Sequence, residues 1–597
     1  MNAEKGTPMT PNRTTAPPAA PPAAPPAAPP AASRAALPTA LPVARAATLR
    51  ATLRAAVPVV RTATVAATVA VVLAALLPTG AARAASIEPQ LITSVDTSAG
   101  GTGARLLLGD VTGDGRLDLV TMQPTYSADD RYIGRQVQAL TAYDFGGGAP
   151  LWQVGTPDPR VTNNGTDIPA EIYDLDGDGD NEVLAVMDSM FRVFDGRTGT
   201  LVREFPVPGP NAWDTIIIAN FRGRPHPQDL VFKDRYNQVW ATDQHGELLW
   251  THTGVTGHRP YPHDFDDDGR QELLAGYDFV TPDGDLVWTA AMADHPDSIA
   301  VGDIDGDGGE DIVFGGAGLG GDSTNAYRAD GTLLWQNLDA VEAQQIGLGD
   351  FRPDLPGLEV AGLDRVDRTA TTGKDALYLV SATGETLWKE NRTTLGCWGT
   401  VMEPLHNWDG TYSDLLLSWN RGCGEVAGIW DGHGRRVATF PVDGRMMRGD
   451  ICGDDRTEVV DYVMGDHAYL YAGGPCDLAA KVTGRPLPQA KRLYNYSRYT
   501  AEEIPADHAQ GRRWSRTGPH TWRVDLGRQR ELTGVRTAFT RDVTYRVDTS
   551  RDGRRWTTAA RAVTGDRVEF TALGRLVRIT TTRGSAHLRG ATVLGTR

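Results

Sequence analysis

The chain has 597 residues, a formal net charge of −16 and only 4 cysteines. A chain of this length normally contains more than one domain, and it can bury sizeable cores. No apolar run is long enough for a bundle of membrane spans, the acidic balance argues against nucleic acid as a partner, and so few cysteines cannot build a disulfide scaffold.

Charge divides the chain into three segments. Residues 1–84 carry a net charge of +7, residues 85–476 carry −36, and residues 477–597 carry +13. A surplus as large as that of the middle segment indicates bound cations or heavy solvation. The composition therefore predicts an acidic central domain between two basic segments.

Residues 1–84 are predicted to be a signal peptide with a Pro/Ala-rich extension. Residues 16–32 are Pro/Ala low complexity, a basic stretch precedes the apolar run Thr62–Leu77, and Ala82-Arg83-Ala84 is a small-residue cleavage site. The apolar run is shorter than a bilayer span. We therefore expect a secreted, extracellular protein that begins near Ala85 and keeps no stable membrane span after processing. An uncleaved single anchor is the alternative.

The middle segment repeats. An apolar strand, an Asp-rich loop and a second apolar strand recur eight times, most clearly around Asp174-Leu-Asp-Gly-Asp-Gly-Asp-Asn-Glu182. A second signal is a Gly-containing turn that leads into an apolar stretch ending in Trp, as in Gly331–Trp335. A period of about 45 residues holds four short strands, which is one blade of a β-propeller. Residues 85–476 are therefore predicted to form an all-β, eight-bladed propeller, with seven blades as the alternative.

The Asp-rich loops have the composition of calcium sites. Oxygen ligands at positions 1, 3, 5 and 9 surround one hard cation, and Ca²⁺ accepts 6–8 oxygens in flexible geometry. We expect several Ca²⁺ ions with mainly structural roles, and a solvated acidic turn is the alternative for each loop. The predicted ligands are Asp110, Thr112, Asp114, Asp118, Asp174, Asp176, Asp178, Glu182, Asp264, Asp266, Asp268, Glu272, Asp303, Asp305, Asp307, Asp311, Asp450, Asp454 and Glu458.

The loops resemble the calcium-binding FG-GAP repeats of integrin-type propellers. The wider sequence is similar to the family-11 rhamnogalacturonan lyases in Asp264–Gly276, in His295-Pro-Asp297 and in Gly349–Glu359. This resemblance implies a calcium-rich, eight-bladed propeller that cleaves acidic pectin. The chain departs from those lyases in two ways: it enters the propeller almost at once after residue 85, and His295 lacks the glycine that follows the family's histidine.

A lyase that acts on a uronate must neutralise the carboxylate, remove the adjacent proton and protonate the leaving oxygen. The stretch Gly257–His263 offers a base, a cation and a phenol, and Asp294–Asp297 and Lys233–Tyr236 come from neighbouring blades. Loops before equivalent strands of adjacent blades should converge on one face. The predicted catalytic residues are His263, His295, His258, Arg259, Tyr261 and Lys233. For each histidine, a hydrogen-bonded structural role is the alternative.

The basic tail is predicted to be a second β domain, residues 491–597, after a linker at residues 477–490. Trp522–Gly527, Ser550–Trp556 and Leu576–Ile579 resemble a discoidin-like (coagulation factor 5/8 C-type) β-sandwich with jelly-roll topology. The resemblance implies a carbohydrate-binding module. Loop aromatics could stack on sugar faces or could belong to the core. The residues concerned are Tyr494, Tyr496 and Trp514.

The four cysteines are expected to form disulfides, because thiols outside the cell tend to oxidise. They are Cys397, Cys423, Cys452 and Cys476, and the sequence leaves three pairings open, of which the local one joins Cys397 to Cys423 and Cys452 to Cys476. Together these features favour a secreted, monomeric polysaccharide lyase that acts on a uronate-containing acidic polysaccharide. A non-catalytic glycan-binding or adhesion protein and a glycoside hydrolase are the alternatives.

Overall fold

The computed structural model divides the chain into two units, Met1–Ala82 and Arg83–Arg597, and every described residue lies in the second. The described residues are 87–126, 134–162, 169–266, 268–292, 295–307, 309–316, 324–367, 374–391, 400–411, 413–420, 427–442, 444–453, 456–478, 506–507, 514–541, 543–565, 567–584 and 586–595. The predicted signal segment, most of the predicted linker, and Cys397, Cys423, Asp454, Tyr494 and Tyr496 lie outside them. No helix within these ranges is long and apolar enough to cross a bilayer.

The regular secondary structure of the described residues is β-strand apart from one 3₁₀ turn, η1 (Ser98–Gly100), so the all-β prediction is confirmed. The first 32 strands form eight four-stranded sheets, and the last seven form one further sheet. In seven of the eight sheets the four strands follow one another along the chain. The sequence analysis favoured eight blades over seven, and eight four-stranded sheets are what the described strands form.

The strands of the eight sheets are β1 (Gln90–Asp96), β30 (Arg445–Gly449), β31 (Glu458–Tyr462) and β32 (His467–Ala472); β2 (Arg105–Gly109), β3 (Asp118–Pro124), β4 (Val137–Tyr143) and β5 (Trp152–Gly155); β6 (Ala170–Tyr173), β7 (Glu182–Met187), β8 (Met190–Asp195) and β9 (Leu201–Pro206); β10 (Thr215–Ala219), β11 (Asp229–Lys233), β12 (Gln238–Thr242) and β13 (Leu248–Thr253); β14 (Tyr261–His263), β15 (Glu272–Ala275), β16 (Asp278–Val280) and β17 (Leu286–Thr289); β18 (Pro296–Gly302), β19 (Asp311–Gly316), β20 (Thr324–Arg328) and β21 (Leu333–Asn337); β22 (Ala343–Gly349), β23 (Glu359–Asp367), β24 (Lys374–Val380) and β25 (Thr386–Asn391); and β26 (Thr400–Leu405), β27 (Leu415–Asn420), β28 (Gly428–Trp430) and β29 (Arg436–Thr439).

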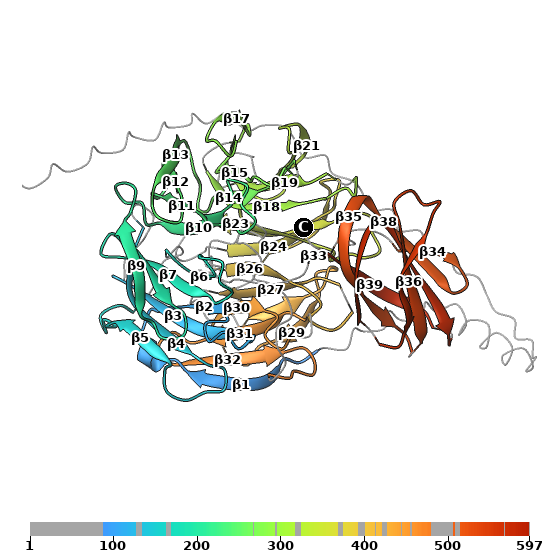
Figure 1. Cartoon of the computed structure of the whole chain (residues 1–597), viewed down its shortest axis with the longest axis horizontal. Helices are drawn as coiled ribbons and strands as arrows, with labels where there is room; N and C mark the ends of the chain where they lie inside the picture. Colours follow the sequence, from blue (N-terminus) through green and yellow to red (C-terminus); the bar gives the residue numbers. More distant parts are fainter. Residues whose placement is uncertain are drawn as a thin grey trace, which may run out of the picture. The chain divides into compact units, whose positions relative to one another are not determined.

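The eight sheets close into a ring (Figure 1). The first strands of successive sheets contact one another, as β2 contacts β6, β6 contacts β10, and β10 contacts β14. The ring closes where β2 contacts β30 and where β1 pairs with β32. The first strand of the chain thereby shares one sheet with β30, β31 and β32. First strands such as β10 are wholly buried and apolar because neighbouring sheets cover both faces, whereas fourth strands such as β9 are largely exposed.

Tryptophans of five fourth strands link their sheet to the next. Their indole nitrogens donate to backbone carbonyls in the turn before the next sheet's fourth strand, at 2.7 to 3.0 Å. The pairs are Trp152–Gly196, Trp250–Pro282, Trp288–Ala329, Trp335–Ala382 and Trp388–Gly432. A glycine of that turn lies against the indole ring of the tryptophan. At Gly331 (φ +86°) a Cβ would come within 3.0 Å of the Trp288 ring. The repeated Gly and Trp signals are therefore two halves of one contact between sheets.

The last seven strands of the chain form a separate sheet. They are β33 (Ala506–Asp507), β34 (Ser515–Gly518), β35 (Thr521–Phe539), β36 (Thr544–Ser550), β37 (Thr557–Val563), β38 (Arg567–Arg583) and β39 (Leu588–Gly595). Its core includes Val524, Tyr545 and Val577, and Trp514 packs against this core while its indole nitrogen donates to the Ala591 carbonyl at 2.8 Å. Trp514 thus has the packing of a core residue, which is the alternative to sugar stacking. The discoidin-like sandwich stays a prediction.

A disulfide joins Cys452 to Cys476 with Cα atoms 5.1 Å apart, so this half of the local pairing is confirmed. It connects the loop after β30 to the segment after β32 in the sheet that closes the ring. The other predicted partners, Cys397 and Cys423, are outside the described residues.

Candidate functional site

Each first strand has two ends with different chemistry. Strand β18 begins with Pro296, directly after His295, and the Asp-rich loop begins at Asp303, directly after its last residue. Seven extended residues span about 23 Å. The histidines and the Asp-rich loops therefore lie at opposite ends of the first strands, which we call the histidine end and the loop end.

The histidine end gathers side chains from three consecutive sheets. Tyr236 comes from the turn between β11 and β12, His258 from the segment before β14, and His295 from the segment before β18. The rings of Tyr236 and His295 are 4.6 Å apart between centroids, and those of His258 and His295 are 5.4 Å apart. The expectation that loops of adjacent blades converge on one face is confirmed for these residues.

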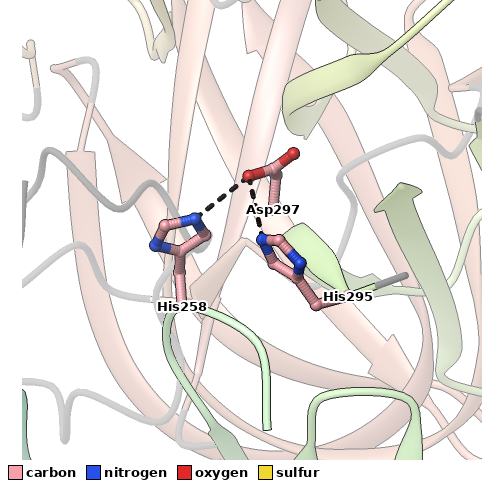
Figure 2. Close-up of side chains that lie close together, drawn as sticks. All are labelled: His258, His295 and Asp297. Carbon is pink, nitrogen blue, oxygen red and sulfur yellow. Dashed lines mark ion pairs between the residues drawn. The ribbon is translucent and has the colours of Figure 1, made fainter. Parts of the chain in front are cut away.

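Asp297 lies between the two histidines (Figure 2). Its Oδ1 is 3.1 Å from His258 Nε2 and 3.9 Å from His295 Nε2. Burial opposes ionisation of this carboxyl, but the hydrogen bond and charge of His258, with the charges of His295 and Arg365, lower the pKa of Asp297 below its ordinary value. The other oxygen, Oδ2, is buried and has no hydrogen-bond partner among the described residues. Asp297 thus contacts both imidazoles through Oδ1, while its Oδ2 makes no hydrogen bond to the described residues.

A buried ion-pair network lies beside His258. Asp214 accepts from Lys233 Nζ at 2.7 Å and from Arg235 Nη1 at 3.0 Å, and the side chains of Lys233 and Asp214 are 0% exposed. Arg235 Nη2 lies 3.3 Å from His258 Nδ1, and its guanidinium lies 5.1 Å from the ring centroid of Tyr236. His258 therefore lies between two charged groups, with Arg235 at its Nδ1 and Asp297 at its Nε2.

His258, His295 and Asp297 also have the composition of a divalent-metal site, with ligand atoms within 4.8 Å of one another. The guanidinium of Arg235 beside His258 does not fit that use, because it places a fixed positive charge next to the cation. The hydrogen-bonded arrangement with an organised imidazole suits acid–base chemistry instead.

Of the predicted catalytic residues, His258 and His295 are in the cluster, and the other four have different positions. Lys233 is fully buried and pairs with Asp214, which also pairs with Arg235, so it can position these groups but cannot touch a substrate. His263 is a correction: it ends β14, pairs with Glu272 and directly precedes Asp264, so it lies at the loop end. Proximity in sequence to His258 placed it wrongly.

Tyr261 is the first residue of β14, and Arg259 precedes this strand. Tyr261 is buried in the core between the β14 and β18 sheets, so its phenol is not part of the cluster. Arg259 donates to Glu171 of β6 at 2.7 Å, which joins the β14 sheet to the sheet two positions earlier in the ring. Arg259 therefore stays at the histidine end as a partner of Glu171.

Sequence reasoning committed to none of Asp297, Arg235, Tyr236 and Asp214 as catalytic residues. The first three stand within the stretches already singled out, so their sequence signal was proximity to His295 and Lys233. Asp214 precedes β10 in an ordinary turn and carries no motif. Its partners come from the next strand of its own sheet, which only the strand register reveals.

The loop end repeats one arrangement. The last carboxylate of each loop begins the second strand and accepts the amide of the residue after the loop's first position: Glu182 accepts from Leu175 at 2.7 Å and Glu272 from Phe265 at 3.0 Å. Asp118 accepts in the same way from Val111 at 3.0 Å. Two eroded copies have a similar bond shifted by one residue: Asp229 accepts from the Arg222 amide at 3.0 Å, and Glu359 accepts from the Arg352 amide at 2.8 Å.

Two of these loops fit a hard cation well. In the Asp174 and Asp264 loops, three carboxylates place oxygens within 4.8 Å of one another: Asp174, Asp176 and Glu182 in one, and Asp264, Asp266 and Glu272 in the other. Burial, together with the charges of the neighbouring carboxylates, raises the pKa of Glu182 to about 7. Carboxylates held this close need a compensating positive charge, and oxygen ligands on a flexible loop suit Ca²⁺.

Two other predicted loops have no such group of three carboxylates among the described residues. Burial raises the pKa of Asp118 to about 7 in the Asp110 loop, where Asp114 pairs with Arg116. In the Asp450 loop, Glu458 accepts from Ile451 and Cys452 at 2.9 Å, and Asp454 is outside the described residues. The Asp303 loop differs from these loops because Arg328 lies among its carboxylates.

Comparison with known proteins gives one relative in sequence. The rhamnogalacturonan endolyase YesW of Bacillus subtilis (strain 168) is 26% identical over 324 residues, which cover 47% of this chain and 46% of that protein. No family model matches the chain. The chain thus spans a little under half the length of the curated relative that it matches.

Solved structures give more distant likenesses. Rhamnogalacturonan lyase PL11 of Bacillus licheniformis is 18% identical with a TM-score of 0.44, over 64% of this chain and 72% of that one. The biofilm matrix protein Bap1 of V. cholerae is 13% identical with a TM-score of 0.47, over 65% of this chain and 91% of that one. The lyase resemblance expected from the sequence is therefore supported by the sequence match, and the calcium-repeat and discoidin resemblances stay predictions.

Proposed function

We propose that this chain is a secreted polysaccharide lyase that cleaves a uronate-containing, rhamnogalacturonan-like glycan by β-elimination. The observation that carries the proposal is the sequence similarity to a rhamnogalacturonan endolyase over 324 residues. The fold by itself would not support an activity, because propellers serve many functions. The histidine end supplies groups that can perform the chemistry.

β-Elimination removes the proton from the carbon next to the uronate carboxylate and expels the glycosidic oxygen from the neighbouring carbon. His295 is the base in this proposal, because its side chain is 19% exposed whereas that of His258 is 8% exposed. Tyr236 is half-buried and lies against His295, so its phenol can return a proton to the leaving oxygen. Because His295 and Tyr236 lie next to each other, both would act on the same face of the sugar.

His258 and Arg235 position and polarise these two groups. His258 lies 3.1 Å from Asp297 and 3.3 Å from Arg235, so its ring is held from both sides. Arg235 is 4% exposed and paired with Asp214, so it acts on the site through His258 and Tyr236. The unpartnered Oδ2 of Asp297 can accept from a sugar hydroxyl or a bound water.

Calcium belongs to the loop end in this proposal. The ligands of the Asp174 and Asp264 loops would hold Ca²⁺, which neutralises the grouped carboxylates and fixes the loops. The basic last domain would bind the acidic polysaccharide, and Arg551, Arg554 and Arg555 are exposed together in its β36–β37 turn. The protein is proposed to act as an extracellular monomer.

The test is ultraviolet absorbance of the unsaturated uronate product, with the purified protein on a panel of acidic polysaccharides. Wild type should generate absorbance on rhamnogalacturonan, and His295→Ala should abolish it. His245→Ala is the matched control, because His245 is exposed in the turn between β12 and β13. Absence of product with every polysaccharide would refute the lyase assignment.

A glycan-binding protein without catalysis is the second candidate. The near-complete burial of His258 and its pairing with Asp297 favour it, because a satisfied buried pair can be purely structural. Retained binding with a flat absorbance trace would identify this function. Appearance of reducing ends without absorbance would instead identify a glycoside hydrolase.

A further inference from the structure

The Asp303 loop contains a positive charge of its own. Arg328, the last residue of β20, pairs with Asp305 at 2.7 Å, with Asp307 at 2.9 Å and with Asp311 at 2.9 Å. These three carboxylates occupy positions 3, 5 and 9 of the loop, which are the positions that a cation would use. The guanidinium therefore occupies the middle of the ligand set.

Strand register explains why only this loop is filled in this way. Arg328 is the Cα partner of Asp311 across the β19–β20 ladder, and opposite charges at paired positions attract. In the Asp174 loop the equivalent partner of Glu182 is Asp195, which adds negative charge instead. The same register position thus supplies a cation in one sheet and an anion in another.

The arginine of the Asp264 loop points elsewhere. Arg270 pairs with Asp283 at 2.6 Å and donates to the Phe221 carbonyl at 2.7 Å, so it ties the loop to the preceding sheet and does not enter the ligand set. A partial parallel to Arg328 occurs in the eroded Asn220 loop, where Arg222 pairs with the last carboxylate, Asp229, at 2.6 Å.

We infer that Arg328 replaces the divalent cation in the Asp303 loop, so that this loop is calcium-independent while the Asp174 and Asp264 loops are not. A planar guanidinium with five donors can satisfy several carboxylates at once, and it cannot be removed by a chelator. Asp303, Asp305 and Asp311 also place ligand atoms within 4.8 Å of one another, so the calcium site expected from the sequence is the alternative that the experiment tests. The inference rests on the proposed calcium loops, and it concerns the strand that carries His295 and Asp297 at its other end.

The experiment counts calcium bound to the full chain after equilibrium dialysis, by elemental analysis, and does not depend on lyase activity. Arg328→Gln should bind one more Ca²⁺ per chain than wild type, because the ligand set is vacated. Arg270→Gln is the matched control and should bind the same number as wild type. Circular dichroism and the melting temperature would establish that both variants are folded.

A second pair of variants decides the matter if Arg328→Gln does not fold. Asp266→Asn should lose one Ca²⁺ per chain, whereas Asp305→Asn should lose none. A folded Arg328→Gln that gains no calcium, or loss of one calcium by Asp305→Asn, would overturn the inference. An inactive protein with the expected calcium counts would refute the lyase proposal alone, so the two failures are distinguishable.

Discussion

The two ends of the first strands differ in how they are built. At the loop end, successive sheets repeat the same bond from a last carboxylate, such as Glu182 or Glu272, to a backbone amide. At the histidine end each of three successive sheets contributes a different set of side chains. The first gives Asp214 and Arg235, the next gives His258, and the third gives His295 with Asp297. Repetition builds the frame, and the chemistry lies where the repetition stops.

The largest expected effect concerns the base at the histidine end. His295→Ala should lower kcat/KM for the glycan by about 10²–10⁴-fold, the usual contribution of a general base. The readout is product absorbance. His263→Ala, at the loop end of β14, should keep kcat/KM within a few-fold of wild type when folded. Equal losses in the two variants would erase the functional difference between the ends.

The next effect tests the support beneath the histidines. Asp214→Asn leaves Lys233 buried without its counter-ion and should lower the free energy of unfolding by about 3–5 kcal/mol. Urea denaturation measures this. Asp188→Asn removes the exposed partner of Arg192 and should cost no more than about 1 kcal/mol. Similar costs would show that Asp214 is not a buried keystone of this end.

Calcium removal tests the loop end. Chelation should lower the free energy of unfolding by about 2.7 kcal/mol for each site that was held at a hundredfold excess over its Kd. The melting temperature should fall, while folded protein keeps its rate at 25 °C for the duration of an assay. An immediate loss of rate with no change in melting temperature would instead locate the functional calcium at the histidine end.

The smallest expected effect is a pH dependence. Because the pKa of Asp297 is lowered in the folded protein, its carboxylate stabilises the fold above the ordinary aspartate pKa of about 4, and this contribution is lost as pH falls through the folded pKa. The difference in unfolding free energy between wild type and Asp297→Asn should therefore be greater at pH 6 than at pH 3. A difference independent of pH would mean that the lowered pKa does not contribute.

The sequence predicted what is local and repeated. Strand–loop–strand patterns around Asp174 and Asp264 located the four-stranded sheets, and the Gly and Trp signals marked the fourth strands that Trp288 and its equivalents occupy. It could not show that Trp288 bonds to Ala329 of the following sheet, because that contact depends on how sheets pack around the ring.

The parts that could not be predicted depend on register and strand length. Arg328 stands in no motif, and only its position opposite Asp311 brings it into the loop. His263 is five residues from His258, yet it is the last residue of β14 and adjoins the Asp-rich loop, whereas His258 precedes the strand. Asp214 meets Lys233 because Thr215 pairs with that residue across β10 and β11.

The pairing of β1 with β32 has a consequence for the order in which the protein can be completed. His467, the first residue of β32 and the partner of Asp96, is made after the chain has grown past seven other sheets. At 5–20 residues per second, β1 waits roughly 20–75 s for its partner. During that interval the strand Gln90–Asp96 exposes unsatisfied backbone groups, which are a template for pairing with another chain. Nascent chains are therefore most vulnerable to misassembly just before the last blade is made.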